Sequence, residues 1–286
     1  MEIDFQENWD IEIKPKTSLF NVKLKEVWKY RDLMSLFVKR DFVAQYKQTI
    51  LGPIWHFVQP VLTTIMFVVV FGRIAKIPTG NIPSVLFYLS GLTIWNYFAV
   101  CLTSTSTTFT SNASIFGKVY FPRLVLPISV VISNMIKFGI QFLLLLAVIV
   151  YYQFHGYPIH FSFSWLLVPV ILLIMAGIGL GAGIILSALT SKYRDFTVLI
   201  GFGIQLLMYL TPVIYPLAYL ETKGKYAAFI HYNPISPLVE GFKFAVFGEG
   251  YYSLYYLGYS LVIMIILLFI GIMYFSKVEK TFMDTV

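Results

Sequence analysis

The feature that most constrains this chain is a series of long apolar runs. A helix that crosses the hydrocarbon layer of a membrane needs about 20 mostly apolar residues. The 286-residue chain contains six such runs, at residues 54–72, 84–108, 124–152, 165–190, 198–216 and 253–275. They are continuous in Leu, Ile, Val and Phe, whereas the strands of a membrane β-barrel alternate. We therefore predict an all-α integral membrane protein with six transmembrane helices.

The composition supports the same class. Hydrophobic residues make up 58% of the chain and charged residues 12%, against about 25% charged residues in soluble domains. Polar side chains are too few to cover the surface of a soluble globule of this length.

The positions of Lys and Arg predict the topology, because basic loops are retained on the cytoplasmic side. If the N-terminus is cytoplasmic, most of the 21 Lys and Arg residues fall in cytoplasmic segments. We predict a multi-pass protein of the cytoplasmic (inner) membrane with both termini in the cytoplasm. The net charge of +7 then reflects topology and attraction to anionic membrane lipids, and we predict no nucleic-acid partner.

The N-terminal region differs from the rest. We predict a cytoplasmic arm and an amphipathic interface helix in residues 1–53, and a six-span transmembrane domain in 54–286. At 27–50, apolar and aromatic residues recur at helical spacing with basic residues between them, which is typical of a helix lying in the membrane interface. Gly52 can end this helix and Pro53 can begin the next, so the dipeptide predicts a corner between an in-plane helix and the first span.

Two connections carry further signals. The loop 110–123, TSNASIFGKVYFPR, is either a short helix that docks into a groove on a soluble partner through Ile115 and Phe116 or an ordinary solvated turn. The segment 217–252 is apolar but broken by prolines and a glycine, so it is too short to span twice. We predict a re-entrant or interfacial segment between spans five and six, because non-helical backbone at that depth must be buried in protein or face water.

The chain lacks the sequence signals of common catalytic and metal sites. It has no GxxxxGK[ST] phosphate loop for ATP, no HExxH motif and no Cys/His metal spacing, so we predict a protein that is not an enzyme and holds no metal. Lys137 is the one ionisable residue deep in a span, with Asn134 and Gln141 on the same helical stripe. It either faces a cavity or partner helix, or it extends toward the membrane interface.

Small and aromatic residues leave two alternatives open. The run AGIGLGAG in span four contains glycines at small-xxx-small spacing, which serve either packing within one chain or a dimer contact. Aromatic residues make up 18% of the chain, and several of them either line a pore for a sugar polymer or face lipid. The candidates are Trp95, Tyr97, Phe98, Tyr209 and Tyr215.

Seven strings carry a resemblance to a known family. The first, KEVWKYRDLMSLFVKRDFVAQYKQTILGPIWHFVQP, is followed in order by VFGRIA, SGLTIWNYF, NASIFGKVYFPRLVLP, SKYRDF, YLTPVIYP and NPISPLVEGFKFAVFG. Together they cover nearly the whole chain, which resembles the permease subunits of type-2 ABC exporters of polysaccharides, namely the O-antigen, capsule and teichoic-acid exporters.

The resemblance implies a homodimer with the type-2 ABC exporter fold, bound to two copies of a separate cytoplasmic ABC ATPase. That ATPase would bind ATP and Mg, and this chain would hold no cofactor. The substrate would be a lipid-linked polysaccharide, with O-antigen favoured over capsule or teichoic acid.

The resemblance also assigns roles to residues. Those expected at the ATPase contact are Arg40, Asp41, Tyr46, Lys47, Asn112, Ile115, Phe116, Gly117, Lys118, Tyr120 and Arg123. Along the channel the resemblance places Trp55, Tyr209 and Tyr215, to which the aromatic and polar patterns above add Trp95, Tyr97, Phe98 and Lys137. The re-entrant exit segment would contain Asn233, Pro234, Pro237 and Glu240. We hypothesise that the Gly52-Pro53 corner passes movement of the interface helix to the first span.

Two other functions compete with this hypothesis. One is an ABC exporter of another lipid or a drug. The other is a membrane-embedded glycosyl- or acyltransferase, for which Glu240 and His231 are the candidate catalytic groups.

Overall fold

The computed structural model describes residues 24–47, 49–50, 52–116, 118–119, 121–158, 162–193, 195–221, 230 and 232–282. All regular elements in these residues are helical. In chain order they are α1 (Leu24–Lys29), α2 (Arg31–Tyr46), η1 (Gly52–Ile54), α3 (Trp55–Phe67), η2 (Val68–Ile74), α4 (Ser84–Ser106), α5 (Thr108–Ser111), α6 (Ala113–Phe116), α7 (Val125–Phe154), η3 (Phe163–Leu166), α8 (Leu167–Lys192), α9 (Phe196–Tyr209), α10 (Leu217–Glu221), α12 (Ser236–Phe247) and α13 (Leu254–Phe282). The all-α prediction is confirmed for this part of the chain.

Five of the helical segments in the described residues are long and apolar enough to cross a membrane. They are Gly52–Ile74, Ser84–Ser106, Val125–Phe154, Phe163–Lys192 and Leu254–Phe275, and each coincides with a predicted run to within a few residues. The run 198–216 differs, because α9 contains 14 residues, which is about 21 Å of helix. The prediction that the helix continues to 216 is wrong. Pro212 disfavours helical backbone at the residue before it, and the chain turns there instead.

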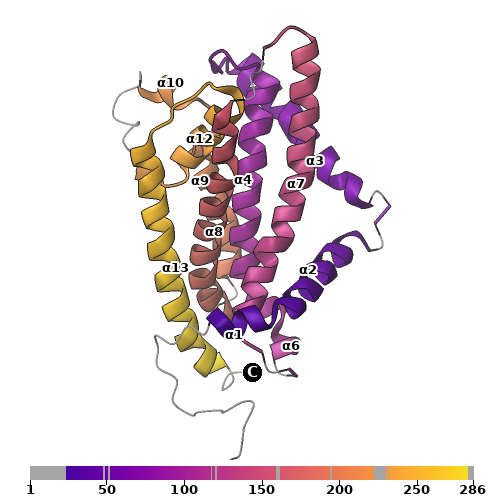
Figure 1. The fold of residues 1–286 in the computed structure, drawn as a ribbon, viewed down its shortest axis with the longest axis vertical. Helices are drawn as coiled ribbons and strands as arrows, with labels where there is room; N and C mark the ends of the chain where they lie inside the picture. The colour runs from indigo at the N-terminus through magenta and orange to yellow at the C-terminus, as the bar shows by residue number, and fades with distance from the viewer. Residues whose placement is uncertain are drawn as a thin grey trace, which may run out of the picture.

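The core of the bundle is α4. It is the most buried of the five long helices, with 78% of its apolar window inside the protein, and it lies between α7 and α8 (Figure 1). Helix α8 packs on its other side against α13. The short helix α12 fits between these long helices, contacting α8, α4 and α13.

Glycines set the close packing of α8. A Cβ atom added at Gly181 would lie 2.8 Å from the backbone carbon of Leu267 in α13, and one added at Gly183 would lie 2.6 Å from Cβ of Thr105 in α4. Gly177 likewise faces α13 and Gly179 faces α4. Of the two alternatives for the AGIGLGAG run, the structure therefore supports packing within one chain.

We expect Gly181→Ala to destabilise the protein by about 1–3 kcal/mol, because the added methyl group meets backbone that cannot move aside. Gly201→Ala is the matched control, since a Cβ there has no neighbour within 4 Å and alanine favours a helix by about 1 kcal/mol. Thermal unfolding of the purified protein in detergent measures both. Equal melting temperatures for the two variants would contradict this account of α8.

The first and last described helices meet at the same end of the bundle. Val27 of α1, Phe37 of α2, Phe109 of α5 and Phe275 of α13 belong to one buried cluster. Figure 1 shows α1, α6 and the end of α13 together at the lower end, with α10 at the opposite end. The described chain thus begins and finishes on one side of the bundle.

The helix predicted at 27–50 is present but ends earlier than expected. It consists of α1 and α2, separated at Tyr30, and α2 ends at Tyr46. The prediction that Gly52 ends it is therefore wrong. Gly52 instead begins the 3₁₀ turn η1 with a φ of +50°, a conformation that favours glycine. Pro53 follows in this first turn, where its missing N–H costs no hydrogen bond.

Candidate functional site

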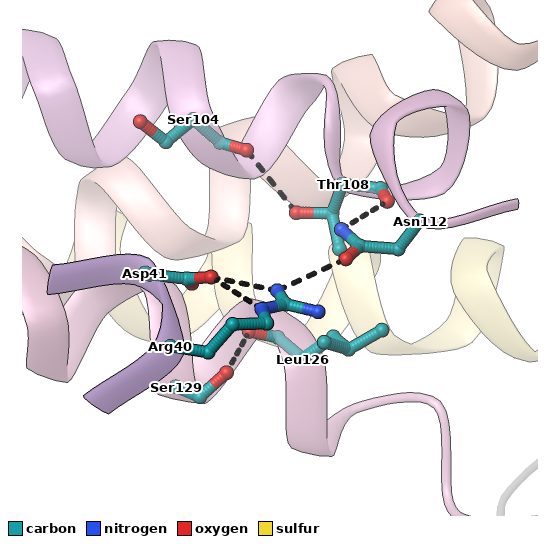
Figure 2. Close-up of polar contacts among 7 residues, drawn as sticks. All are labelled: Arg40, Asp41, Ser104, Thr108, Asn112, Leu126 and Ser129. Atoms are coloured by element: carbon teal, nitrogen blue, oxygen red, sulfur yellow. Dashed lines mark hydrogen bonds and ion pairs between the residues drawn. The ribbon is translucent and has the colours of Figure 1, made fainter. Parts of the chain in front are cut away.

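A chain of hydrogen bonds joins the interface helix to the second span. Arg40 of α2 donates from Nη2 to Oδ1 of Asn112, with 3.1 Å between the atoms. Asn112 in turn donates to the Thr108 carbonyl oxygen at 3.0 Å, and the Thr108 hydroxyl donates to the carbonyl oxygen of Ser104 at 3.2 Å. Figure 2 shows this path from α2 through the loop into the last turn of α4. Segments 72 residues apart in sequence are thereby linked directly.

The Arg40 guanidinium is held on two further sides. Its Nη2 atom lies 2.7 Å from Oδ1 of Asp41 (Figure 2), and its Cζ atom lies 4.8 Å from the ring centroid of Phe37. A half-exposed ion pair contributes at most about 1 kcal/mol. The arrangement therefore serves mainly to aim the guanidinium at Asn112.

Aromatic rings pack beneath this polar link. Phe37 and Phe116 both contact Phe121, with ring centroids 5.7 and 5.8 Å apart, and Phe116 also contacts Phe109 at 5.7 Å. The guanidinium of Arg123 lies over the Phe116 ring at 5.4 Å. Together with the hydrogen-bonded path, these contacts combine α2 and the loop after α4 into one packed unit, which we call the coupling unit.

The coupling unit changes which residues can meet a partner. Phe116 is only 6% exposed, so its predicted role as an anchor in a partner's groove is wrong in this conformation. Asn112 and Arg123 are also buried, and Ile115 is half-buried. Among the described residues, the exposed side chains of the predicted contact set are Arg40, Lys47 and Lys118, joined by Val119 at 57% exposure. Gly117 and Tyr120 lie outside the described residues.

The predicted channel residues separate into two groups. Trp95, Tyr97 and Phe98 are 3%, 4% and 2% exposed within the core cluster of this chain. Their assignment to a channel lining is therefore wrong for this conformation. Trp55 on α3 and Tyr209 on α9 are about half exposed, and the Tyr215 hydroxyl donates to the Tyr209 carbonyl oxygen. These two helices keep aromatic side chains available for a partner or a substrate.

Lys137 lines a polar cavity of about 170 Å³ between α2, α3, α4 and α7. Of the two alternatives for this lysine, the structure supports the cavity. Asn134 and Gln141 line it as well, so the polar stripe predicted on α7 is brought together in one place. At the edge of this region the rings of Tyr46 and His56 meet edge to face at 5.3 Å. Burial raises the pKa of Tyr46, so its hydroxyl stays protonated.

The segment before α12 is fixed by an asparagine. The Asn233 side-chain amide donates to the Leu210 carbonyl at 3.0 Å and to the Thr211 hydroxyl at 2.9 Å, and its oxygen accepts from the backbone N–H of Ile235 at 3.0 Å. The Pro234 carbonyl accepts from the Ser260 hydroxyl at 2.7 Å. These contacts connect the start of α12 to the turn after α9 and to α13.

A buried ion pair holds α12 itself. Lys243 Nζ lies 3.4 Å from Oε1 of Glu240 and donates to the Pro212 carbonyl oxygen at 2.6 Å. The same ammonium lies 3.6 Å from the ring centroid of Phe87 on α4. The other carboxylate oxygen of Glu240 accepts from the N–H of Tyr251 at 3.3 Å. Both charged side chains are at most 2% exposed.

Sequence reasoning missed Lys243. The residues expected in the exit segment do not include it. Pro237, which was expected there, lies in the first turn of α12, where proline is favoured. The available signal was the spacing of Glu240 and Lys243, three residues apart on an otherwise apolar helix, which places opposite charges side by side.

Comparison with known proteins agrees with this architecture. Residues 33–247 match the family model described as ABC-2 type transporter. Two proteins of Klebsiella pneumoniae named O-antigen export system permease protein RfbA are 29% and 28% identical over 254 residues, which is 88% of this chain and 94% of each relative. A protein of the same name from Myxococcus xanthus is 28% identical over 227 residues, covering 79% of this chain and 84% of the relative. On the family match, with five long apolar helices in the described residues of which α4 is the most buried, the chain belongs to the ABC-2 type transporter family.

Proposed function

We propose that this chain is the transmembrane permease subunit of an ATP-driven exporter that moves lipid-linked O-antigen polysaccharide across the inner membrane. It works as a homodimer with two copies of a cytoplasmic ABC ATPase, which binds ATP and Mg. The observation that carries the proposal is similarity to O-antigen export permeases over 88% of the chain. The coupling unit supports it, because an ATPase that pushes on α2 would move the loop after α4 with it.

We infer a six-span topology with both ends in the cytoplasm. In support, Val27 and Phe275 share one cluster at one end of the bundle, so the chain crosses an even number of times. Five long helices are odd in number, and α9 with the turn at 210–216 supplies the remaining crossing. Helix α12 then lies on the outer side as a re-entrant segment, with the opposite charges of Glu240 and Lys243 paired inside the protein.

The transferase alternative loses support at Glu240. Both carboxylate oxygens are engaged, one by Lys243 and the other by the backbone of Tyr251. A general base needs an oxygen within reach of a substrate proton. His231, the other candidate, lies outside the described residues.

The test is ATP hydrolysis by the chain co-purified with its ATPase, with and without lipid-linked glycan. We expect the glycan to stimulate hydrolysis, and the paired substitution Lys118→Glu, Val119→Asp to abolish the stimulation, because both side chains are exposed on the coupling unit. Arg73→Ala, an exposed change on η2 at the far end of the first span, is the control.

Each contrary result has a separate meaning. A complex that forms but ignores the glycan would shift the proposal to an exporter of another lipid or a drug. Failure to bind any ATPase would overturn the exporter proposal itself.

A further inference from the structure

The polar cavity beside Lys137 has the composition of a binding site. Its wall includes five side-chain amides and one ammonium, contributed by Gln45, Gln59, Asn96, Asn134, Gln141 and Lys137. They come from α2, α3, α4 and α7. The other residues of α3, α4 and α7 are mostly apolar. Gln45 and Gln59 are exposed, Asn96, Lys137 and Gln141 are half-buried, and Asn134 is buried. A buried donor is costly unless it has a partner.

Several of these donors have no partner within the protein. Asn134 is 3% exposed, and among the described residues its Nδ2 atom has no oxygen or nitrogen acceptor, with only the weakly accepting Cys101 thiol beside it. The Nε2 atom of His56, which also lines the cavity, is buried without a partner among the described residues, and it can donate to a ligand in one of the two tautomers. In the part of the chain that the structure describes, Lys137 makes neither a hydrogen bond nor an ion pair. Buried donors in native proteins are almost always paired, so the cavity lacks an acceptor that a ligand would bring.

The missing acceptor carries negative charge. Asp41 is near enough to attract Lys137, but its carboxylate is already paired with Arg40 at 2.7 Å. A neutral sugar hydroxyl would satisfy the amides and leave the ammonium without a counter-charge. A phosphate group offers several acceptor oxygens with a negative charge, and lysine is a common point-charge partner for it.

The position of the cavity restricts what carries the phosphate. Lys137 lies about 18 Å along α7 from Val125, at 1.5 Å per residue. A free anion reaching this depth would have to leave water. A lipid can bring a phosphate from the membrane interface while its chain stays in the hydrocarbon layer, and Val100 and Phe138 give the cavity an apolar wall for that chain. The cavity volume of about 170 Å³ leaves room for a headgroup phosphate.

We propose that this cavity binds the phosphate of a membrane lipid at the junction of the interface helix and the first span. Gln45 of α2 and Gln59 of α3 would reach the phosphate from one side, and Lys137 and Asn134 of α7 from the other. The ligand would therefore brace α2 against α3. Two sources share this chemistry: an anionic phospholipid, and the carrier of a lipid-linked glycan, the second of which depends on the proposed function.

The test is binding by the purified full chain in detergent, followed by native mass spectrometry. Undecaprenyl phosphate, undecaprenol and phosphatidylglycerol are the three probes. We expect undecaprenyl phosphate or phosphatidylglycerol to bind and undecaprenol not to. Preference for undecaprenyl phosphate identifies a glycan carrier as the source, and preference for phosphatidylglycerol identifies a structural phospholipid.

Lys137→Met keeps the side-chain length without the charge, and we expect it to weaken phosphate-lipid binding about 10- to 100-fold. Lys137→Arg restores the charge and should recover most of the affinity, which separates binding from any folding defect. Lys192→Met, at an exposed position on α8, controls for general attraction to anionic lipid.

Equal binding of all three probes, or equal loss in the Lys137→Met and Lys192→Met variants, would overturn the site. Because the measurement uses no ATPase and no glycan, its failure is distinguishable from failure of the exporter proposal.

Discussion

Replacing Lys243 with Met is expected to lower the free energy of unfolding by about 3–5 kcal/mol, because breaking a buried ion pair leaves the other charge uncompensated. Glu240 would keep only the N–H of Tyr251 as a partner, in a position that is 2% exposed. The Pro212 carbonyl oxygen and the Phe87 ring would lose the ammonium as well. The links from α12 to the turn after α9 and to α4 would therefore weaken together.

Thermal unfolding in detergent measures this loss, which corresponds to a melting temperature lower by about 10 °C. The double variant Glu240→Gln, Lys243→Met removes both charges and should recover much of the stability, because a neutral pair avoids the desolvation penalty. Lys76→Met is the control, as an exposed lysine after η2. If the double variant were as unstable as Lys243→Met alone, the ion pair would not be the source of the effect.

Hydropathy was sufficient to predict five of the spans, since a run of about 20 apolar residues has few other folds available. It was insufficient at α9. The run 198–216 is mostly apolar, but Pro212 interrupts the backbone hydrogen bonding of a helix, an effect that hydropathy does not register. Tertiary contacts then fix the turn, through Asn233 and the Lys243 ammonium.

The sequence could not assign side chains to channel, lipid or core. In a soluble helix the polar face marks the outside, but a spanning helix is apolar on the side facing lipid and on the side facing protein alike. Trp95 and Trp55 are therefore equivalent in sequence, although one is 3% exposed and the other 48%. Polar residues were more informative, because Asn134, Lys137 and Gln141 could be placed on one stripe and line one cavity.

The coupling residues show the same limit. Arg40 and Asn112 were both expected near the ATPase from the family resemblance, but their hydrogen bond to each other joins parts of the chain far apart in sequence. No local pattern predicts such a contact. The burial of Phe116 follows from it, because the loop folds back on α2 and its aromatic side chain faces Phe121.

Replacing Gly52 and Pro53 with Ala-Ala is expected to lower export about 5- to 150-fold, which is the change that typical coupling free energies between two sites produce. ATP hydrolysis and assembly of the complex should persist. The hypothesis is that α2 moves the first span through η1. Gly52 holds a φ of +50°, which alanine disfavours, and Pro53 fixes the backbone where the first span begins. Loss of both would let the 3₁₀ turn relax, so that movement of the coupling unit is absorbed before it reaches α3.

Gly80→Ala is the matched control for this experiment. Gly80 has a φ of +67° and, like Gly52, no atom within 4 Å of an added Cβ. The two glycine substitutions therefore impose the same kind of backbone strain, one between α2 and α3 and the other in the connection from η2 to α4. If strain alone mattered, both variants would lose export equally. If α2 moves the first span through η1, only the Gly52-Pro53 variant should lose export, and its glycan-stimulated hydrolysis should be retained. Full export by that variant would mean that α2 drives the first span by another path.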